Sequence, residues 1–130
     1  MNDSHTRTDE CRAALTEHLR PELFRALCDS NRLTLVARLA AATRPLTVTE
    51  AATCCGVHLS GVSRHLSMLR DAGVLKATRQ GREVRYELDC GALAGALREM
   101  ADALETCRDV CCAPTEENRD ERCGNQCESC

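Results

Sequence analysis

The scarcity of aromatic side chains most limits what this chain can fold into. Its 130 residues include one phenylalanine, one tyrosine and no tryptophan, although 43% of the residues are hydrophobic. A core must therefore be built from leucine, alanine and valine, and alanine and leucine are strong helix formers. The length suffices for one compact domain and hardly for two. We therefore expect a mainly α-helical domain.

The composition also suggests where that domain begins and ends. We expect a flexible N-terminus over residues 1–8, a folded domain over 9–112 and a disordered acidic tail over 113–130, which contains cysteines and carries the entire net charge of −3. No run approaches the roughly 18 apolar residues that a membrane span needs, and the first ten residues lack the apolar segment of a signal peptide. These features predict a cytoplasmic protein without a membrane segment.

Apolar spacing and cap residues predict six helices and one small β-hairpin. Thr47 and Glu50 have the spacing of a capping box, and Gly73 is placed to end a helix. Apolar and charged residues alternate over 83–88, as in a strand with one exposed face. Two helices are predicted to start at Pro21 and at Asp29–Ser30, four more to span about 9–20, 47–54, 58–71 and 91–112, and the hairpin strands to span 74–79 and 83–88.

The middle of the chain has the order of elements found in a winged helix-turn-helix. A short helix over 47–54, a turn over 55–57 and a second helix over 58–71 form the helix-turn-helix, and the hairpin that follows makes it winged. Residues 58–86 carry six basic and two acidic residues, although the whole chain is acidic. A local basic patch fits an anionic partner such as DNA. From charge alone, a solvated charged face is an equal alternative.

The second helix of this motif would enter the major groove with its N-terminal residues near the base edges. Hydroxyl, arginine and histidine side chains there can bond phosphates or bases, and a glycine would let the backbone approach closely. The tip of the hairpin could reach a neighbouring minor groove or phosphates. The predicted DNA-binding residues are His58, Ser60, Gly61, Ser63, Arg64 and His65 on the helix, and Arg79, Gln80, Arg82 and Arg85 on the hairpin.

Three segments carry a resemblance to a known family. LFRALCDSNRLTLVARL, SRHLSMLRDAGVL and GREVRYEL, between about Leu23 and Leu104, resemble the first helical segment, recognition helix and wing of the ArsR/SmtB family of metal-responsive winged-helix repressors. The resemblance implies a homodimer that binds operator DNA and releases it when metal binds. It also implies dimerisation through the last helix, at Leu93, Leu97, Met100 and Leu104; periodicity alone shows only an apolar stripe there.

The eleven cysteines are the second unusual feature. In a reducing compartment they indicate metal ligands or reactive thiols, and an odd number does not suit a closed set of disulfides. Cys54 and Cys55 stand where the short helix meets the turn. Cys107 and Cys111 continue the apolar stripe of the last helix, with Cys112 beside them, on the face expected at the dimer seam. Apolar packing is the alternative role for both groups.

The metal sites that the family resemblance would suggest are missing. Thr47, Thr49 and Ala52 stand where one arsenic-binding pattern has cysteines, and all four histidines precede the last helix. We expect Cys28 to be a buried core thiol and Cys90 to be structural at the start of a helix. Cys11 could complete a site across a dimer, and Cys123, Cys127 and Cys130 could scavenge metal or serve a redox role.

Thiolate-rich sites without histidine favour soft ions. Three thiolates suit As(III) and Sb(III), Hg(II) accepts two or three, and Cd(II) and Pb(II) also fit; zinc takes four thiolates. The leading hypothesis is a homodimeric repressor that arsenite releases from double-stranded DNA. The alternatives are a repressor that senses Hg(II), Cd(II) or Pb(II), a repressor switched by a disulfide, and a metal-buffering protein. An enzyme is disfavoured, since no phosphate loop or catalytic constellation is evident.

Overall fold

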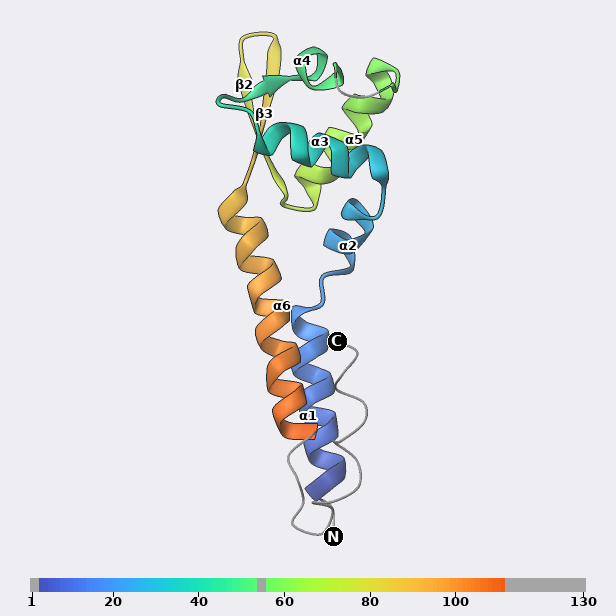
Figure 1. Cartoon of the computed structure of the whole chain (residues 1–130), viewed down its shortest axis with the longest axis vertical. Coiled ribbons are helices and arrows are strands. Elements are labelled where there is room, and N and C mark those ends of the chain that lie inside the picture. Colours follow the sequence, from blue (N-terminus) through green and yellow to red (C-terminus); the bar gives the residue numbers. More distant parts are fainter. Residues whose placement is uncertain (1–2, 54–55, 112–130) are drawn as a thin grey trace. The chain divides into compact units, whose positions relative to one another are not determined.

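A computed structural model describes residues 3–53 and 56–111 of the chain (Figure 1). The chain divides into two compact units. The first unit, Leu19–Glu99, contains the predicted winged helix-turn-helix. The second contains the chain up to His18 together with the residues from Met100 onward.

Four helices of the first unit enclose its core. They are α2 (Pro21–Leu27), α3 (Ser30–Ala40), α4 (Val48–Ala52) and α5 (Leu59–Asp71). The core is aliphatic, as the shortage of aromatic residues predicted. Its largest fully buried side chains are Leu35, Val62, Leu66, Leu69 and Val74.

A three-stranded antiparallel sheet completes this unit. Its strands are β1 (Leu46–Thr47), β2 (Leu75–Gln80) and β3 (Glu83–Leu88), in the order β1-β3-β2. The hairpin of β2 and β3 was predicted, and Gly81 takes a φ of 63° at its tip. The strand β1 was not predicted, because two residues are too few to show an alternating pattern. It forms by pairing Leu46 with Tyr86, forty positions later in the sequence.

The predicted caps are present. The Asp29 carboxylate accepts hydrogen bonds from the backbone N–H groups of Asn31 and Arg32 at the start of α3. Thr47 and Glu50 form both bonds of a capping box on α4. Gly73 follows α5 with a φ of 80°, a conformation that glycine adopts without steric cost. The chain thereby turns directly from α5 into the wing.

The second unit is helical. Helix α1 (Asp3–His18) belongs to it, as does the part of α6 (Cys90–Cys111) that begins at Met100. The α1 helix begins six residues before the predicted start at Asp9, since no proline or glycine interrupts the preceding residues. It ends before the predicted boundary near Arg20, because Pro21 disfavours helical backbone at the residue before it.

Membrane spanning was not expected for this chain. No helix within residues 3–53 and 56–111 combines the length and the apolar character that crossing a bilayer requires.

Candidate functional site

The helix-turn-helix corner presents one side of α5 to solvent. The opposite side packs into the core through three side chains with no exposed surface, Val62, Leu66 and Leu69. His58, Ser60 and Arg64 are exposed, as an interface with DNA requires, while Ser63 is half-buried. Polar residues are therefore available at the N-terminal end of α5, where a recognition helix contacts base edges.

Gly61 has a packing role within this corner. A Cβ atom at this position would lie 2.7 Å from Cγ1 of Val57. Such a distance is too short for two carbon atoms, so a larger residue would push the turn away from α5. The sequence predicted that Gly61 permits close approach of DNA, whereas its nearest neighbour in the structure is this turn residue.

A groove connects α5 with the wing. Its volume is about 630 Å³, and it lies between α4, α5 and strand β3. Ser63 of α5 and Arg82 of the hairpin tip both line it. Arg79, Gln80 and Arg82 are exposed at the tip. The fold thus brings two separately predicted groups of DNA-binding residues to one surface.

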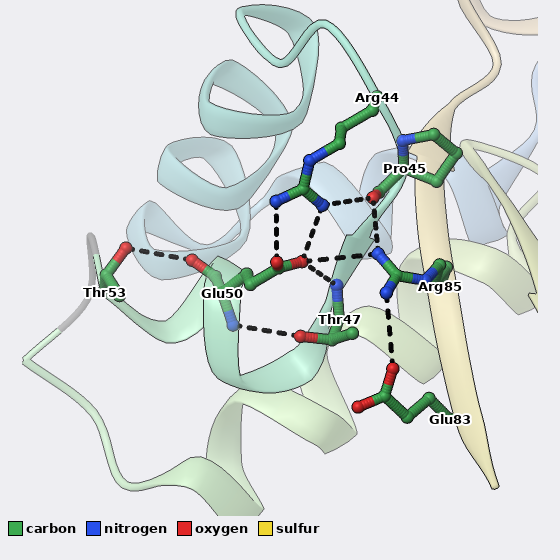
Figure 2. A network of polar contacts seen from close by, with 7 residues as sticks. All are labelled: Arg44, Pro45, Thr47, Glu50, Thr53, Glu83 and Arg85. Carbon is green, nitrogen blue, oxygen red and sulfur yellow. Dashed lines mark hydrogen bonds and ion pairs between the residues drawn. The ribbon is translucent and has the colours of Figure 1, made fainter.

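Arg85 does not extend into solvent like the arginines of the tip. Its guanidinium donates a hydrogen bond to the Pro45 carbonyl at 3.4 Å and lies 3.3 Å from the Glu83 carboxylate and 3.7 Å from that of Glu50 (Figure 2). Its Nε is buried and has no hydrogen-bond partner among the described residues. The structure thus engages Arg85 within its own chain, although the sequence suggested a contact with DNA.

Glu50 is the centre of this cluster. Its carboxylate accepts two hydrogen bonds from Arg44 and one from the Thr47 backbone N–H (Figure 2). The Arg44 guanidinium, followed by the Thr47 bond, lowers the pKa of Glu50 from 4.5 to about 2. The same carboxylate therefore caps α4 and links it to the segment before β1 and to β3.

Arg32 is a buried cation that the sequence analysis missed. Its guanidinium donates to the backbone carbonyls of Arg25 and Ala26 at the end of α2. It also lies 3.4 Å from Nδ1 of His65 on α5. His65 is therefore half-buried beside α3 and is less open to DNA than predicted.

A sequence signal for Arg32 did exist. Arg32, Leu35 and Leu39 follow one another at helical spacing, and all three are buried. Leu33 is also apolar, but half of its side chain is exposed (51%). Arg32, and not the neighbouring Leu33, therefore joins Leu35 and Leu39 on the buried face of α3.

Two of the cysteines that the structure describes are in contact. Cys11 is buried and Cys107 half-buried, and the Cys107 thiol donates to the Cys11 carbonyl at 3.3 Å. Cys28 is exposed, contrary to the prediction of a core thiol, because it occupies the turn after α2 rather than the helix itself. Cys90 is exposed and is the first residue of α6.

Most predicted metal ligands lie outside the described residues. This applies to Cys54, Cys55, Cys112 and the tail cysteines Cys123, Cys127 and Cys130, while Cys111 is the last residue of α6. Within residues 3–53 and 56–111, no three histidine, cysteine or acidic side chains are grouped as they would be around a metal ion. The assignment of the metal ligands therefore stays a prediction.

The residues of the predicted dimerisation stripe of α6 differ in exposure. Met100 is buried, with 5% of its surface exposed, whereas Leu97 and Leu104 are 47% and 54% exposed. Leu93 is half-buried. Leu97 and Leu104 are seven residues apart and thus lie on one face of the helix. The exposed apolar surface of α6 therefore includes Leu97 and Leu104 and not Met100.

A helix-turn-helix followed directly by an antiparallel hairpin with a basic tip defines the winged helix-turn-helix class. A helix-turn-helix domain profile matches residues 27–77. The chain is 42% identical over 83 residues to the HTH-type transcriptional regulator CmtR of Mycobacterium tuberculosis, covering 63% of this chain and 68% of CmtR. The chain belongs to the ArsR/SmtB family of transcriptional regulators.

Two further similarities agree with this assignment. The transcriptional repressor SmtB homolog of Synechocystis is 38% identical over 84 residues, which cover 65% of this chain and 62% of that protein. A homodimeric winged helix-turn-helix domain from Mycobacterium bovis, described as a possible ArsR-family regulator, superposes with a TM-score of 0.52 at 26% identity. That match covers 75% of this chain and 85% of the other.

Proposed function

We propose that this protein is a homodimeric repressor that binds operator DNA and releases it when a thiophilic ion binds its cysteines. The observation that carries the DNA half of the proposal is the groove shared by Ser63 and Arg82, which places the recognition helix and wing tip on one surface. The similarity to the Synechocystis repressor supports the direction of control. The proposal has no catalytic step, and it places the protein in the cytoplasm with the DNA.

Dimerisation is proposed through α6. Leu97 and Leu104 expose about half of their side chains on one face of this helix. Covering a leucine is worth about 1.5–3 kcal/mol, so a second copy of the helix would gain from meeting this face. The homodimeric domain from Mycobacterium bovis supports a two-chain assembly.

The proposed ion is soft, with As(III) as the first choice and Sb(III), Hg(II), Cd(II) and Pb(II) as alternatives. Thiolates favour such ions over hard cations. The proposed ligands come from Cys54, Cys55, Cys107, Cys111 and Cys112. Each thiol must lose its proton on binding, so the affinity for the ion should rise with pH.

The first experiment measures DNA release directly. Fluorescence anisotropy would follow the reduced protein on DNA from upstream of its own gene, challenged separately with As(III), Hg(II), Cd(II) and Zn(II). Release by one ion at stoichiometric concentration is expected and would identify the inducer. DNA binding that no ion disturbs would contradict the metal-responsive half, and no DNA binding would contradict the repressor.

Two variants separate the DNA half from the metal half. Arg64→Ala should weaken DNA binding by about 1–3 kcal/mol and leave ion affinity unchanged, with Arg38→Ala, an exposed arginine of α3, as the control. Cys111→Ser combined with Cys112→Ser should keep DNA binding and lose release. If that double variant still responds, Cys54 and Cys55 become the leading ligands.

A further inference from the structure

Two cysteines far apart in the sequence are in contact where α1 meets α6. Cys107 Sγ lies 3.3 Å from the carbonyl oxygen of Cys11, and both side chains are thiols in the structure. Cys11 is 8% exposed, and Cys107 is half-buried. Both residues belong to the same compact unit. A single chain therefore brings this pair together without a second copy.

Cys11 lies on the covered side of α1. It is the most buried side chain described in that helix, and the half-buried residues that follow it are Ala14, Leu15 and His18. These residues are spaced by three or four positions from Cys11 or from one another, as on one face of a helix. The Cys11 side chain is therefore part of the contact face of α1 and not of its solvent side.

Cys107 lies on the covered side of α6. Met100 and Ala103 are buried, and Cys107 follows them at the spacing of one helical face. Leu97 and Leu104, at the edge of this stripe, are 47% and 54% exposed. Cys107 thus continues the buried stripe of Met100 and Ala103 and contacts α1. Cys11 and Cys107 are thus neighbours on the covered sides of the two helices, with Cys11 buried and Cys107 half-buried.

We propose that Cys11 and Cys107 bind one soft divalent metal ion, of the kind that accepts two thiolates, as a bridge between α1 and α6 of one chain. Hg(II) is the representative ion. On binding, each S–H group gives its proton to solvent and each sulfur forms one bond to the metal; no electron is transferred. Two thiolates neutralise a divalent ion, so the partly buried site would carry no net charge.

The number of donors determines the kind of ion. Zinc requires four ligands, and among the described residues no third histidine, cysteine or acidic side chain joins this pair to make a metal-binding group. A two-coordinate soft ion needs none. A site made of these two thiolates would suit Hg(II) better than Zn(II), in contrast to sites with three or four thiolates.

This inference adds Cys11 to the ligands of the proposed function, and it does not depend on DNA release. Ion binding to the pair is a property of α1 and α6 and can be measured without DNA. The anisotropy experiment decides whether occupancy of any cysteine site releases DNA. The two measurements can fail independently, so each proposal is tested separately.

Thiol mapping on the full-length protein tests the pair. Trypsin would leave Cys11 and Cys107 alone on peptides 8–12 and 99–108, and Cys111 with Cys112 on peptide 109–119. The reduced protein is incubated with one equivalent of Hg(II) and glutathione as a competing thiol, and then alkylated. The labelling time is set on metal-free protein so that both single-cysteine peptides are fully modified. Joint protection of Cys11 and Cys107 is expected.

Variants then show whether the two residues act together. Cys11→Ser should expose Cys107 to alkylation in the presence of Hg(II) and lower the affinity of the site more than about 100-fold, since even partners outside the ligand shell change affinity 10–100-fold. Cys28→Ser and Cys90→Ser, which remove exposed cysteines, are the matched controls and should leave the protection of both peptides unchanged.

Two results would contradict the proposed ion site of Cys11 and Cys107. One is protection of Cys107 in the wild-type protein while Cys11 is fully labelled. The other is unchanged protection of Cys107 in the Cys11→Ser protein, which would assign Cys107 to a site with Cys111 and Cys112. The first result needs no variant, so it decides the question even if the substitution at buried Cys11 impairs folding.

Discussion

The two helices of the helix-turn-helix are held in different ways. Helix α4 has five residues and buries one side chain, Ala51. It is attached by its capping box and by the Arg44–Glu50–Arg85 cluster (Figure 2). Helix α5 has thirteen residues, and Val62, Leu66 and Leu69 anchor it with no exposed surface.

This difference implies that the attachment of α5 is stable, whereas the attachment of α4 changes with conditions. Burial of apolar surface involves no charged group, so protonation and charge screening do not loosen the attachment of α5 to the core. Ion pairs at partly exposed sites contribute about 0–1 kcal/mol each and weaken with salt or protonation. The support helix α4, which Cys54 and Cys55 follow in the sequence, is thus held by the contacts that conditions can change.

The largest expected effect tests the apolar anchoring of α5. Leu66→Ala should lower the free energy of unfolding by about 2–5 kcal/mol, because it removes a fully buried side chain and leaves a cavity. Urea unfolding followed by circular dichroism measures it. Leu33→Ala, at an exposed position of α3, should change stability by less than about 0.5 kcal/mol. Equal losses in the two proteins would contradict the assignment of α5 to the core.

A substitution at Arg32 tests the polar contacts of this side chain with the end of α2 and with His65 of α5. Arg32→Met should cost about 1–3 kcal/mol of stability, because the carbonyls of Arg25 and Ala26 lose their buried donor. Unfolding by urea is again the measurement, and Arg38→Met on the exposed side of the same helix is the control. If the two arginine variants are equally stable, the buried guanidinium does not hold α2, α3 and α5 together.

Removal of the cap of α4 should have a smaller effect on the free energy of unfolding. Thr47→Ala removes the hydroxyl that accepts a hydrogen bond from the Glu50 backbone N–H, and it should cost about 0.5–2 kcal/mol. Thermal unfolding would compare it with Thr49→Ala, an exposed threonine within α4. Thr47→Ser should retain most of the stability. A loss in Thr49→Ala as large as in Thr47→Ala would show that the cap is not the cause.

The smallest expected effect is the pH dependence of stability that comes from the ion pairs of Glu50. The folded pKa of Glu50, about 2, lies below its ordinary value of 4.5. Its contribution to stability is therefore complete above about pH 4.5 and is lost as the pH falls toward 2. The difference in the free energy of unfolding between the wild-type protein and Glu50→Gln should therefore shrink as the pH falls from about 4.5 toward 2.

Unfolding measured at several pH values checks this prediction. Glu87→Gln, at an exposed glutamate of β3, is the matched control. If Glu50→Gln and Glu87→Gln show the same pH profile, the cluster around Glu50 is not the source of the acid sensitivity.

The predictions from sequence that were confirmed concern features contained within a few residues. The cap at Asp29, the capping box of Thr47 and Glu50, and the turn at Gly73 each depend on side chains and backbone within one helical turn. The wing likewise follows from an alternating pattern and a glycine. Such features are local, so the sequence shows them directly.

The contacts that the sequence did not indicate depend on distant neighbours. Arg32 rather than Leu33 faces the core, because the carbonyls at the end of α2 accept its hydrogen bonds. Arg85 turns toward Glu50 and the Pro45 carbonyl because β1 pairs with β3. Helical spacing shows which residues share a face, but not what covers that face.

The amino-acid sequence by itself determined the helices, the wing, the family and the exposed polar residues of the recognition helix, because each is encoded by local spacing and chemistry. Only the tertiary structure decided which arginines are buried, which face of α6 is covered, and that Cys107 meets Cys11. Residues 96 positions apart become neighbours only when helices pack. That packing is set by the shape and burial of whole helix faces, which no short stretch of sequence contains.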